Sequence, residues 1–217
     1  MVFEAPWNGA DQDSTSPSPN LGSPRSELRE TLANGSEFNW KPYDPVTGTA
    51  TNTHTLQATC RLESVPSKVI FGQIHAETPV PTGGAVPAVT LFHEGSGTAN
   101  KRIRLAVYYS PDRSVTNAGS QDQTYDIVSG VNLGDRIDYE LKLSGTSNSA
   151  VTLNATVAVN GGTNITQLVG MTSDPGYSGW GNTNVTLYFK AGCYYPKAAT
   201  NSGTAKVTFS SLSATHQ

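Results

Sequence analysis

The chain has 217 residues, a length at which an all-β protein often forms one undivided domain. Charged residues make up 14% of it and the formal net charge is -3, which argues against binding nucleic acid or an acidic membrane through bulk positive charge. An anionic ligand would have to meet a local group of basic side chains. No apolar run approaches the roughly 18 residues of a membrane-spanning helix, so we expect no membrane association.

Residues 8–23 are rich in Gly, Asp, Ser, Pro and Asn, and they predict a loop-like lead-in within a single domain of residues 1–217. After it, short stretches alternate in polarity, as is typical of β-strands. Without helical periods or a fixed repeat, they indicate an all-β sandwich or jelly roll, an architecture that fits lectins, glucanases and lyases equally. The predicted strands are 25–31, 55–63, 68–77, 88–92, 102–110, 124–128, 138–143, 151–159, 184–191 and 206–212.

Two of these strands carry chemically active side chains of one parity, which places them on one face of the strand. Arg25, Glu27 and Arg29 put two cations on either side of a carboxylate that can hold the guanidinium groups in position. Gln73 and His75 lie side by side, while the residue between them points to the core. Taken singly, each pattern is more often structural, as a solvated ladder of ion pairs or a structural histidine.

A third stretch, residues 188–194, also separates polar from apolar side chains. Tyr188, Lys190 and Tyr194 share one face, and the alternate residues, Cys193 among them, form an apolar face. Together the three stretches assemble Arg, Gln, His, Lys and Tyr side chains. Such a set has a coherent use in breaking a polymer of uronic acids by β-elimination.

β-Elimination removes the weakly acidic proton on carbon 5 of a uronate and expels the glycosidic oxygen from carbon 4. Neutralising the adjacent carboxylate lets negative charge flow into it as the C–H bond breaks, and Arg25 and Gln73 suit that task. A general base must take the proton, and an acid must protonate the leaving oxygen. Tyr194 can serve if cations such as Lys190 and Arg29 stabilise its phenolate.

The chain has RSELR at 25–29, QIH at 73–75 and YFKAGCY at 188–194. In identity and order these resemble the R-[ST]-E-[LV]-R, Q-[IV]-H and Y-F-K-A-G-x-Y-x-Q signatures of alginate lyases of polysaccharide lyase family 7. The resemblance covers essentially the whole chain. It implies a β-jelly roll of two antiparallel sheets with a concave substrate cleft, which cuts alginate by β-elimination without a metal or cofactor.

Carried over position by position, the resemblance implies that Arg25 and Gln73 neutralise the carboxylate. Tyr194 would be the catalytic acid and base at mannuronate linkages, and His75 would neutralise the carboxylate or act as the base at guluronate linkages. Pro196 departs from the family pattern, which usually has Gln there, so the preferred block of alginate stays open. The other motif residues are expected to bind or orient the substrate: Glu27, Arg29, Tyr188 and Lys190.

Two arginines and two cysteines can each be interpreted in two ways. Arg102 and Arg104 share a strand face and are either subsite residues for a polyanion or part of an ordinary exposed face. Cys60 and Cys193 fall on core parities, so they are either bridged by a disulfide or buried as free thiols. Neither cysteine belongs to a CxxC pair or a histidine cluster, and we expect no metal site.

A β-sandwich with these motifs could also have a function other than alginate cleavage. A retaining glucanase needs two carboxylates about 5 Å apart, commonly from an E-x-D-x-x-E strand, and the chain has none. A lyase of another polyuronate such as glucuronan, or a non-catalytic carbohydrate-binding module, stays open. We expect a secreted, monomeric, endo-acting lyase whose partner is the anionic polysaccharide alginate, with neither nucleic acid nor membrane as a partner.

Overall fold

The computed structural model describes residues 1–7, 24–44, 52–77, 86–95, 101–112, 114–174, 176–182, 184–196 and 203–217. The predicted lead-in over residues 8–23 lies outside these ranges. None of the described residues forms a helix that could cross a membrane. The strands are β1 (Val2–Trp7), β2 (Arg25–Arg29), β3 (Asn52–Ser64), β4 (Lys68–Ala76), β5 (Pro87–Glu94), β6 (Arg102–Tyr108), β7 (Asp122–Ser129), β8 (Arg136–Ser147), β9 (Ala150–Val159), β10 (Ile165–Gly170), β11 (Leu187–Tyr194) and β12 (Gly203–His216).

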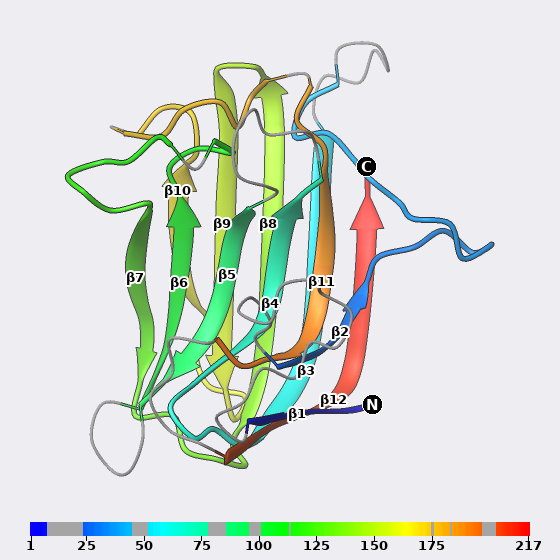
Figure 1. The fold of residues 1–217 in the computed structure, drawn as a ribbon, viewed down its shortest axis with the longest axis vertical. Helices are drawn as coiled ribbons and strands as arrows, with labels where there is room; N and C mark the ends of the chain where they lie inside the picture. Colours follow the sequence, from blue (N-terminus) through cyan, green and yellow to red (C-terminus); the bar gives the residue numbers. More distant parts are fainter. Residues whose placement is uncertain are drawn as a thin grey trace.

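These strands form two antiparallel sheets (Figure 1), as the sequence predicts. The back sheet has the order β1-β12-β3-β8-β9-β10, and the front sheet has the order β2-β11-β4-β5-β6-β7. Half of the neighbouring strand pairs are distant in sequence, and two of these pairs, β2 with β11 and β11 with β4, bring the three motif strands side by side. This order assembles one face from residues that are up to about 170 positions apart.

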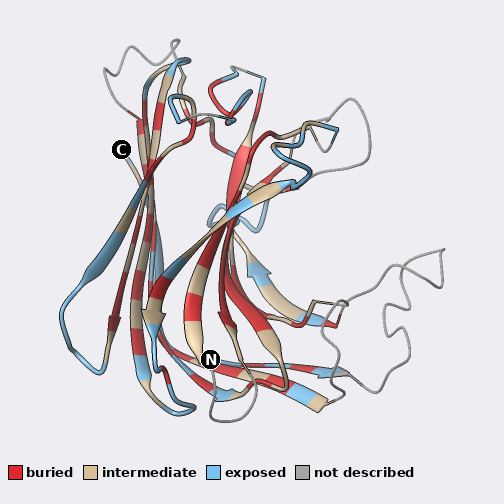
Figure 2. Cartoon of the chain, turned by 90° about the vertical axis from the view of Figure 1, so that its left-hand side faces the viewer, coloured by how far each residue is buried: buried red, intermediate tan, exposed pale blue. Residues whose placement is uncertain are grey.

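Alternation in the sequence explains the long strands of the back sheet. In β3, Leu56, Ala58, Cys60 and Leu62 point into the core, and the residues between them are partly or fully exposed. Strand β9 follows the same pattern, and buried residues run along the strands of both sheets (Figure 2). Burial of these side chains against the opposite sheet is the main stabilising contribution to such a sandwich.

Strand β4 of the front sheet interrupts the alternation with a bulge. The register against β5 shifts between Ile70 and Gly72, so that Phe71 and Gly72 both face the back sheet. A Cβ atom on Gly72 would lie 3.0–3.1 Å from the buried ring of Tyr139, whose hydroxyl donates to the Phe71 carbonyl at 3.2 Å. The bulge leaves Ile70 and Gln73 on the outer face of the front sheet, where the motif residues gather.

The two cysteines are buried free thiols, so the disulfide that the sequence leaves open is not formed. Cys60 lies on β3 of the back sheet and Cys193 on β11 of the front sheet, so their strands are not neighbours in a sheet. Burial raises the pKa of both thiols.

Candidate active site on the front sheet

A cleft of about 510 Å³ runs across the outer face of the front sheet. Nearly all of its wall comes from strands β2, β11, β4, β5 and β6, and residues of all three sequence motifs contribute to it. Its cationic side chains exceed its carboxylates by one, although the chain as a whole is acidic. The residues that line it are Arg25, Glu27, Lys68, Ile70, Gln73, His75, Pro87, Thr90, Ala106, Tyr108, Asp122, Tyr188, Lys190, Tyr194 and Pro196.

Strand register brings the motifs together, because β11 pairs with β2 on one side and with β4 on the other. The bulge in this part of the sheet adds a residue to β11 between Ala191 and Tyr194, which keeps the motif tyrosine in the cleft. The cross-strand neighbours are Tyr194 with Arg25, Lys190 with Gln73, and Tyr188 with His75.

Glu27 is a nearly buried carboxylate at the base of the cleft, with a side chain only 6% exposed. It accepts a short hydrogen bond from Gln73 Nε2, and its other oxygen lies 3.7 Å from Lys190 Nζ. Burial raises the pKa of Glu27, and the positive charges of Lys190 and Arg25 oppose that rise. An amide nitrogen carries two hydrogens, so Gln73 retains a second N–H for a ligand while Glu27 fixes its orientation.

The imidazole of His75 has a defined tautomer. Its Nδ1 lies 2.9 Å from the Ala76 carbonyl oxygen and 3.2 Å from the Tyr188 hydroxyl. Because a carbonyl oxygen only accepts, Nδ1 carries the hydrogen, and Nε2 keeps its lone pair. Burial lowers the pKa of His75 to about 4, and the nearby cations Lys190 and Arg25 act in the same direction. The ring is therefore neutral near pH 7 and can accept a proton at Nε2.

Tyr194 lines the cleft, and its ring has both an apolar contact and a cationic neighbour. It packs against an apolar floor of Ile70, Phe92 and Ala106. The Arg25 guanidinium carbon is 4.9 Å from the ring centroid, so a cation stands beside the phenol. The phenol of Tyr194 therefore lies in the cleft next to a guanidinium group from the neighbouring strand.

A family model described as alginate lyase matches residues 1–216. The chain belongs to the alginate lyase family. It is thus a polysaccharide lyase that acts on alginate, and the resemblance drawn from the three motifs is confirmed.

Solved structures agree with this assignment and with the predicted β-jelly roll. The chain is 31% identical to alginate lyase PA1167 from Pseudomonas aeruginosa, over 92% of this chain and 78% of that one, with a TM-score of 0.63. It is 27% identical to the family 7 alginate lyase A1-II′ in complex with the substrate GGMG, over 100% and 78%, with a TM-score of 0.68. A variant of A1-II′ with the product GGG gives the same identity and TM-score. No curated protein matches the chain.

The structure places one motif residue, Arg29, differently from the sequence prediction. Arg29, expected to contact substrate or Tyr194, does not line the cleft. Its guanidinium pairs with Glu37 at 3.2 Å and Glu77 at 3.0 Å, and it stacks 3.8 Å from the centroid of Tyr188. Arg29 therefore supports Tyr188 from outside the cleft, and Arg25 is the cation over Tyr194.

Arg102 and Arg104 also lie outside the residues that line the cleft. Both guanidinium groups are engaged by the same two carboxylates. Arg104 lies 2.6 Å from Glu94 and 2.6 Å from Asp126, and Arg102 lies 3.5 Å and 3.0 Å from them. Of the two interpretations that the sequence leaves open, the ion-paired strand face fits this geometry.

Four polar residues that line the cleft on strands β4 to β7 were not predicted from the sequence. They are Lys68, Thr90, Tyr108 and Asp122. Lys68 had a readable signal, because it begins a predicted strand on the parity of Ile70. The other three reach the cleft only through the pairing of β5, β6 and β7, which alternation does not reveal.

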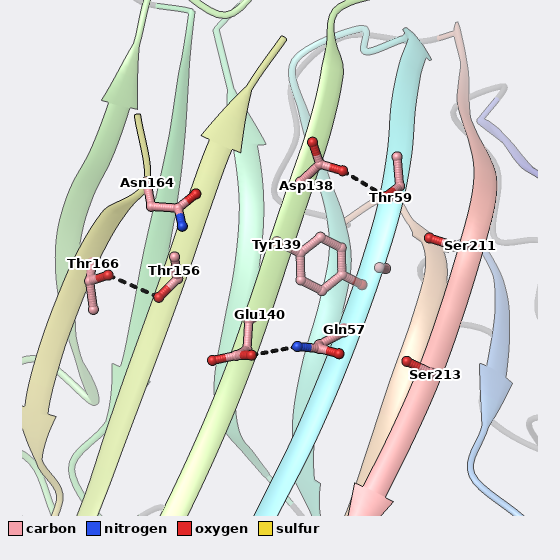
Figure 3. Close-up of a pocket in the computed structure, with 11 residues that line it drawn as sticks. Gln57, Thr59, Asp138, Tyr139, Glu140, Thr156, Asn164, Thr166, Ser211 and Ser213 are labelled. Atoms are coloured by element: carbon pink, nitrogen blue, oxygen red, sulfur yellow. Dashed lines mark hydrogen bonds between the residues drawn. The ribbon is translucent and has the colours of Figure 1, made fainter. Parts of the chain in front are cut away.

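A second hollow of about 510 Å³ lies on the outer face of the back sheet (Figure 3). Its carboxylates accept hydrogen bonds of 2.6 Å, Glu140 from Gln57 and Asp138 from Thr59. Other hydroxyl and amide groups line it, and none of its lining residues is Arg, Lys or His. The lining of this hollow offers a polyuronate no cationic side chain, so the front cleft is the candidate active site.

The described ranges of the chain contain no group of three or more His, Cys, Asp or Glu that could hold a metal ion.

Proposed function

We propose that the protein is a secreted, monomeric, endo-acting alginate lyase that uses no metal ion. The observation that carries this proposal is the register of β2, β11 and β4, which gathers Arg25, Gln73, His75 and Tyr194 around one cleft. One chain supplies all four groups, so no second subunit is needed to complete the site.

Charge neutralisation is assigned to Arg25 and to the second amide hydrogen of Gln73. Both groups line the cleft that contains Tyr194, so a uronate carboxylate bound there can meet both. As the proton leaves carbon 5, negative charge develops on that carboxylate, and hydrogen bonds aimed at it stabilise the transition state. Glu27 contributes by orienting Gln73, since the short bond between them fixes the amide.

Proton transfer is assigned to Tyr194 and His75. The phenolate of Tyr194, or Nε2 of His75 at the opposite face of a guluronate, takes the proton from carbon 5. The electron pair of the C–H bond forms a double bond between carbons 4 and 5, and the bond from carbon 4 to the glycosidic oxygen breaks. The Tyr194 hydroxyl then supplies the proton that the leaving oxygen needs.

The endo mode is supported by the extent of the cleft on both sides of Tyr194. Arg25 and Pro196 line one end, and Tyr108 and Asp122 line the other, so a polymer has room on each side of the scissile bond. Secretion follows from the substrate, because a long polyanionic polysaccharide does not cross a cell membrane by itself.

The variant Tyr194→Phe tests the assignment. It deletes one hydroxyl and keeps the ring on its apolar floor, so kcat on alginate should fall by at least about 100-fold while polymer binding changes little. Tyr108→Phe removes a hydroxyl from the same cleft, two strands away from β4, and should keep most of the activity. If Tyr194→Phe retained more than a tenth of the wild-type kcat, the assignment of Tyr194 would be wrong.

A further inference from the structure

The front cleft contains a lysine that none of the three motifs includes. Lys68 is the first residue of β4, and its side chain shares the outer face with Ile70. Its ammonium nitrogen lies 3.7 Å from the ring centroid of Phe92. Lys68 and Tyr194 thus line one cleft and contact the same apolar floor.

The position of Lys68 relative to the reaction centre follows from one row of cross-strand neighbours. Tyr194 lies opposite Arg25 on β2 and opposite Ile70 on β4, and Ile70 lies opposite Phe92 on β5. Arg25 is therefore on one side of Tyr194, and the Phe92 ring that carries the Lys68 ammonium is on the other. A polymer lying across Tyr194 has one of these cations on each side of its scissile bond.

Glu94 and Asp122 attract the ammonium group of Lys68, but neither forms an ion pair with it. Glu94 lies directly opposite Lys68 in the sheet, but its carboxylate is turned to Arg104 and Arg102, at 2.6 Å and 3.5 Å. Asp126 is held by the same two arginines, so two carboxylates balance two guanidinium groups. Within the described ranges Lys68 forms no ion pair, and a cation–π contact holds an ammonium group without neutralising it.

From this geometry we infer that Lys68 binds the carboxylate of the uronate on the leaving-group side of the scissile bond, across Tyr194 from Arg25. Every sugar of alginate carries a carboxylate, so the residue next to the reacting one must bring a second negative charge into the cleft. The inference rests on the proposed function and adds a binding residue to it. Since this carboxylate does not change charge in the reaction, the contact stabilises ground state and transition state alike.

The partial burial of the Lys68 side chain supports this assignment. Desolvation lowers the pKa of Lys68, against the attraction of Glu94 and Asp122. A group that has lost part of its hydration gains more from a new carboxylate partner than a fully solvated lysine does. Arg102 and Arg104, by contrast, would have to give up existing ion pairs to bind the polymer.

The test compares Lys68→Gln, Lys68→Arg and a control, Lys142→Gln, on the outer face of the back sheet. Loss of one such contact should raise KM for alginate about fivefold and leave kcat within about twofold. The KM of Lys68→Gln should also respond less to added salt than that of the wild type. Lys68→Arg should restore most of the affinity, and Lys142→Gln should match the wild type.

Binding measurements in the Tyr194→Phe background separate this inference from the proposed function. Calorimetry with alginate oligomers should show Kd about fivefold higher when Lys68→Gln is added. An unchanged KM and Kd, or a loss confined to kcat, would overturn the inference. If the wild type released no unsaturated product while the Lys68 effect on Kd persisted, the proposed function would fail and the Lys68 contact would stand. A thermal midpoint close to that of the wild type confirms that each variant is folded.

Discussion

Replacing Glu30 by alanine should destabilise the lyase through the loss of one buried acceptor. Glu30 follows directly after β2, the strand that carries Arg25 and Glu27. Its side chain is 10% exposed, and it accepts hydrogen bonds from Trp40 Nε1 at 3.1 Å, from the Phe189 amide at 3.3 Å and from His216 Nε2 at 2.5 Å. These donors belong to the segment after β2, to β11 and to β12, so one carboxylate joins both sheets.

The magnitude follows from the donors that would be left without an acceptor. Each of the two buried N–H groups, from Trp40 and Phe189, costs about 1–3 kcal/mol when unsatisfied. The contact with His216 is partly exposed and adds less, so the total loss is about 4 kcal/mol. In a domain of this size 1 kcal/mol corresponds to roughly 2–4 °C, which predicts a fall of roughly 12 °C in the thermal midpoint.

Differential scanning calorimetry and urea unfolding of Glu30→Ala measure this loss. The matched control is Glu37→Ala, because Glu37 is 61% exposed and its contact with Arg29 is a surface ion pair. That control should shift the midpoint by no more than about 3 °C. A loss below about 1 kcal/mol for Glu30→Ala would show that the carboxylate does not satisfy these donors, and the reasoning would be refuted.

Two further predictions concern buried titratable groups. Burial lowers the pKa of His54 and of His75 to about 4, from an ordinary value of 6.5, so the unfolded chain takes up these protons first as the pH falls. The free energy of unfolding should therefore be highest above pH 6.5 and decrease as the pH falls towards 4. At pH 5 the loss should be at most about 2 kcal/mol per histidine. Urea unfolding that is unchanged between pH 7 and pH 5 would contradict this. The thiols of Cys60 and Cys193 should not react with a thiol reagent in the native protein, because both are buried, and both should react after unfolding. Rapid labelling of the native protein, or the absence of a free thiol after unfolding, would contradict the structure.

Parity along single strands could be read from the sequence because one side of each strand meets an apolar core. The separation of Gln73 and His75 from the buried Ile74 is an example, as is that of Tyr188 from Phe189. Ten of the strands in the described ranges were predicted, with shifted ends. Strand β11 ends at Tyr194 and not at residue 191, because the extra residue of its bulge hides the continued pairing.

Two strands, β10 and β1, were not predicted, and both lie at an edge of the back sheet. Strand β10 lies at the edge of the back sheet and has mostly exposed side chains, with Leu168 61% exposed. Strand β1 is short and lies at the opposite edge, paired with β12. Pairing with β9, and not a hydrophobic pattern, defines β10, whereas β1 does alternate, with Phe3 and Ala5 buried on either side of the exposed Glu4.

Pairing between strands also determines which cationic side chains line the cleft. A single sequence does not show this pairing. Arg102 and Arg104 have the parity of cleft residues, but Glu94 from β5 and Asp126 from β7 come into register with them. Lys68 has no motif around it, yet it lines the cleft and forms no ion pair within the described ranges, because Glu94 pairs with Arg104. The candidate site was therefore predictable where motif residues share a strand face, and not where carboxylates arrive from neighbouring strands.

The most direct test of metal-independent β-elimination is the ultraviolet absorbance of the unsaturated uronate. Purified protein with EDTA would be followed over time on polymannuronate, polyguluronate and glucuronan in parallel. The account predicts rising absorbance on at least one of the two alginate polymers, at a rate that EDTA does not change. Silence on both alginate polymers, or activity that EDTA abolishes, would contradict it, and binding without elimination would indicate a carbohydrate-binding module.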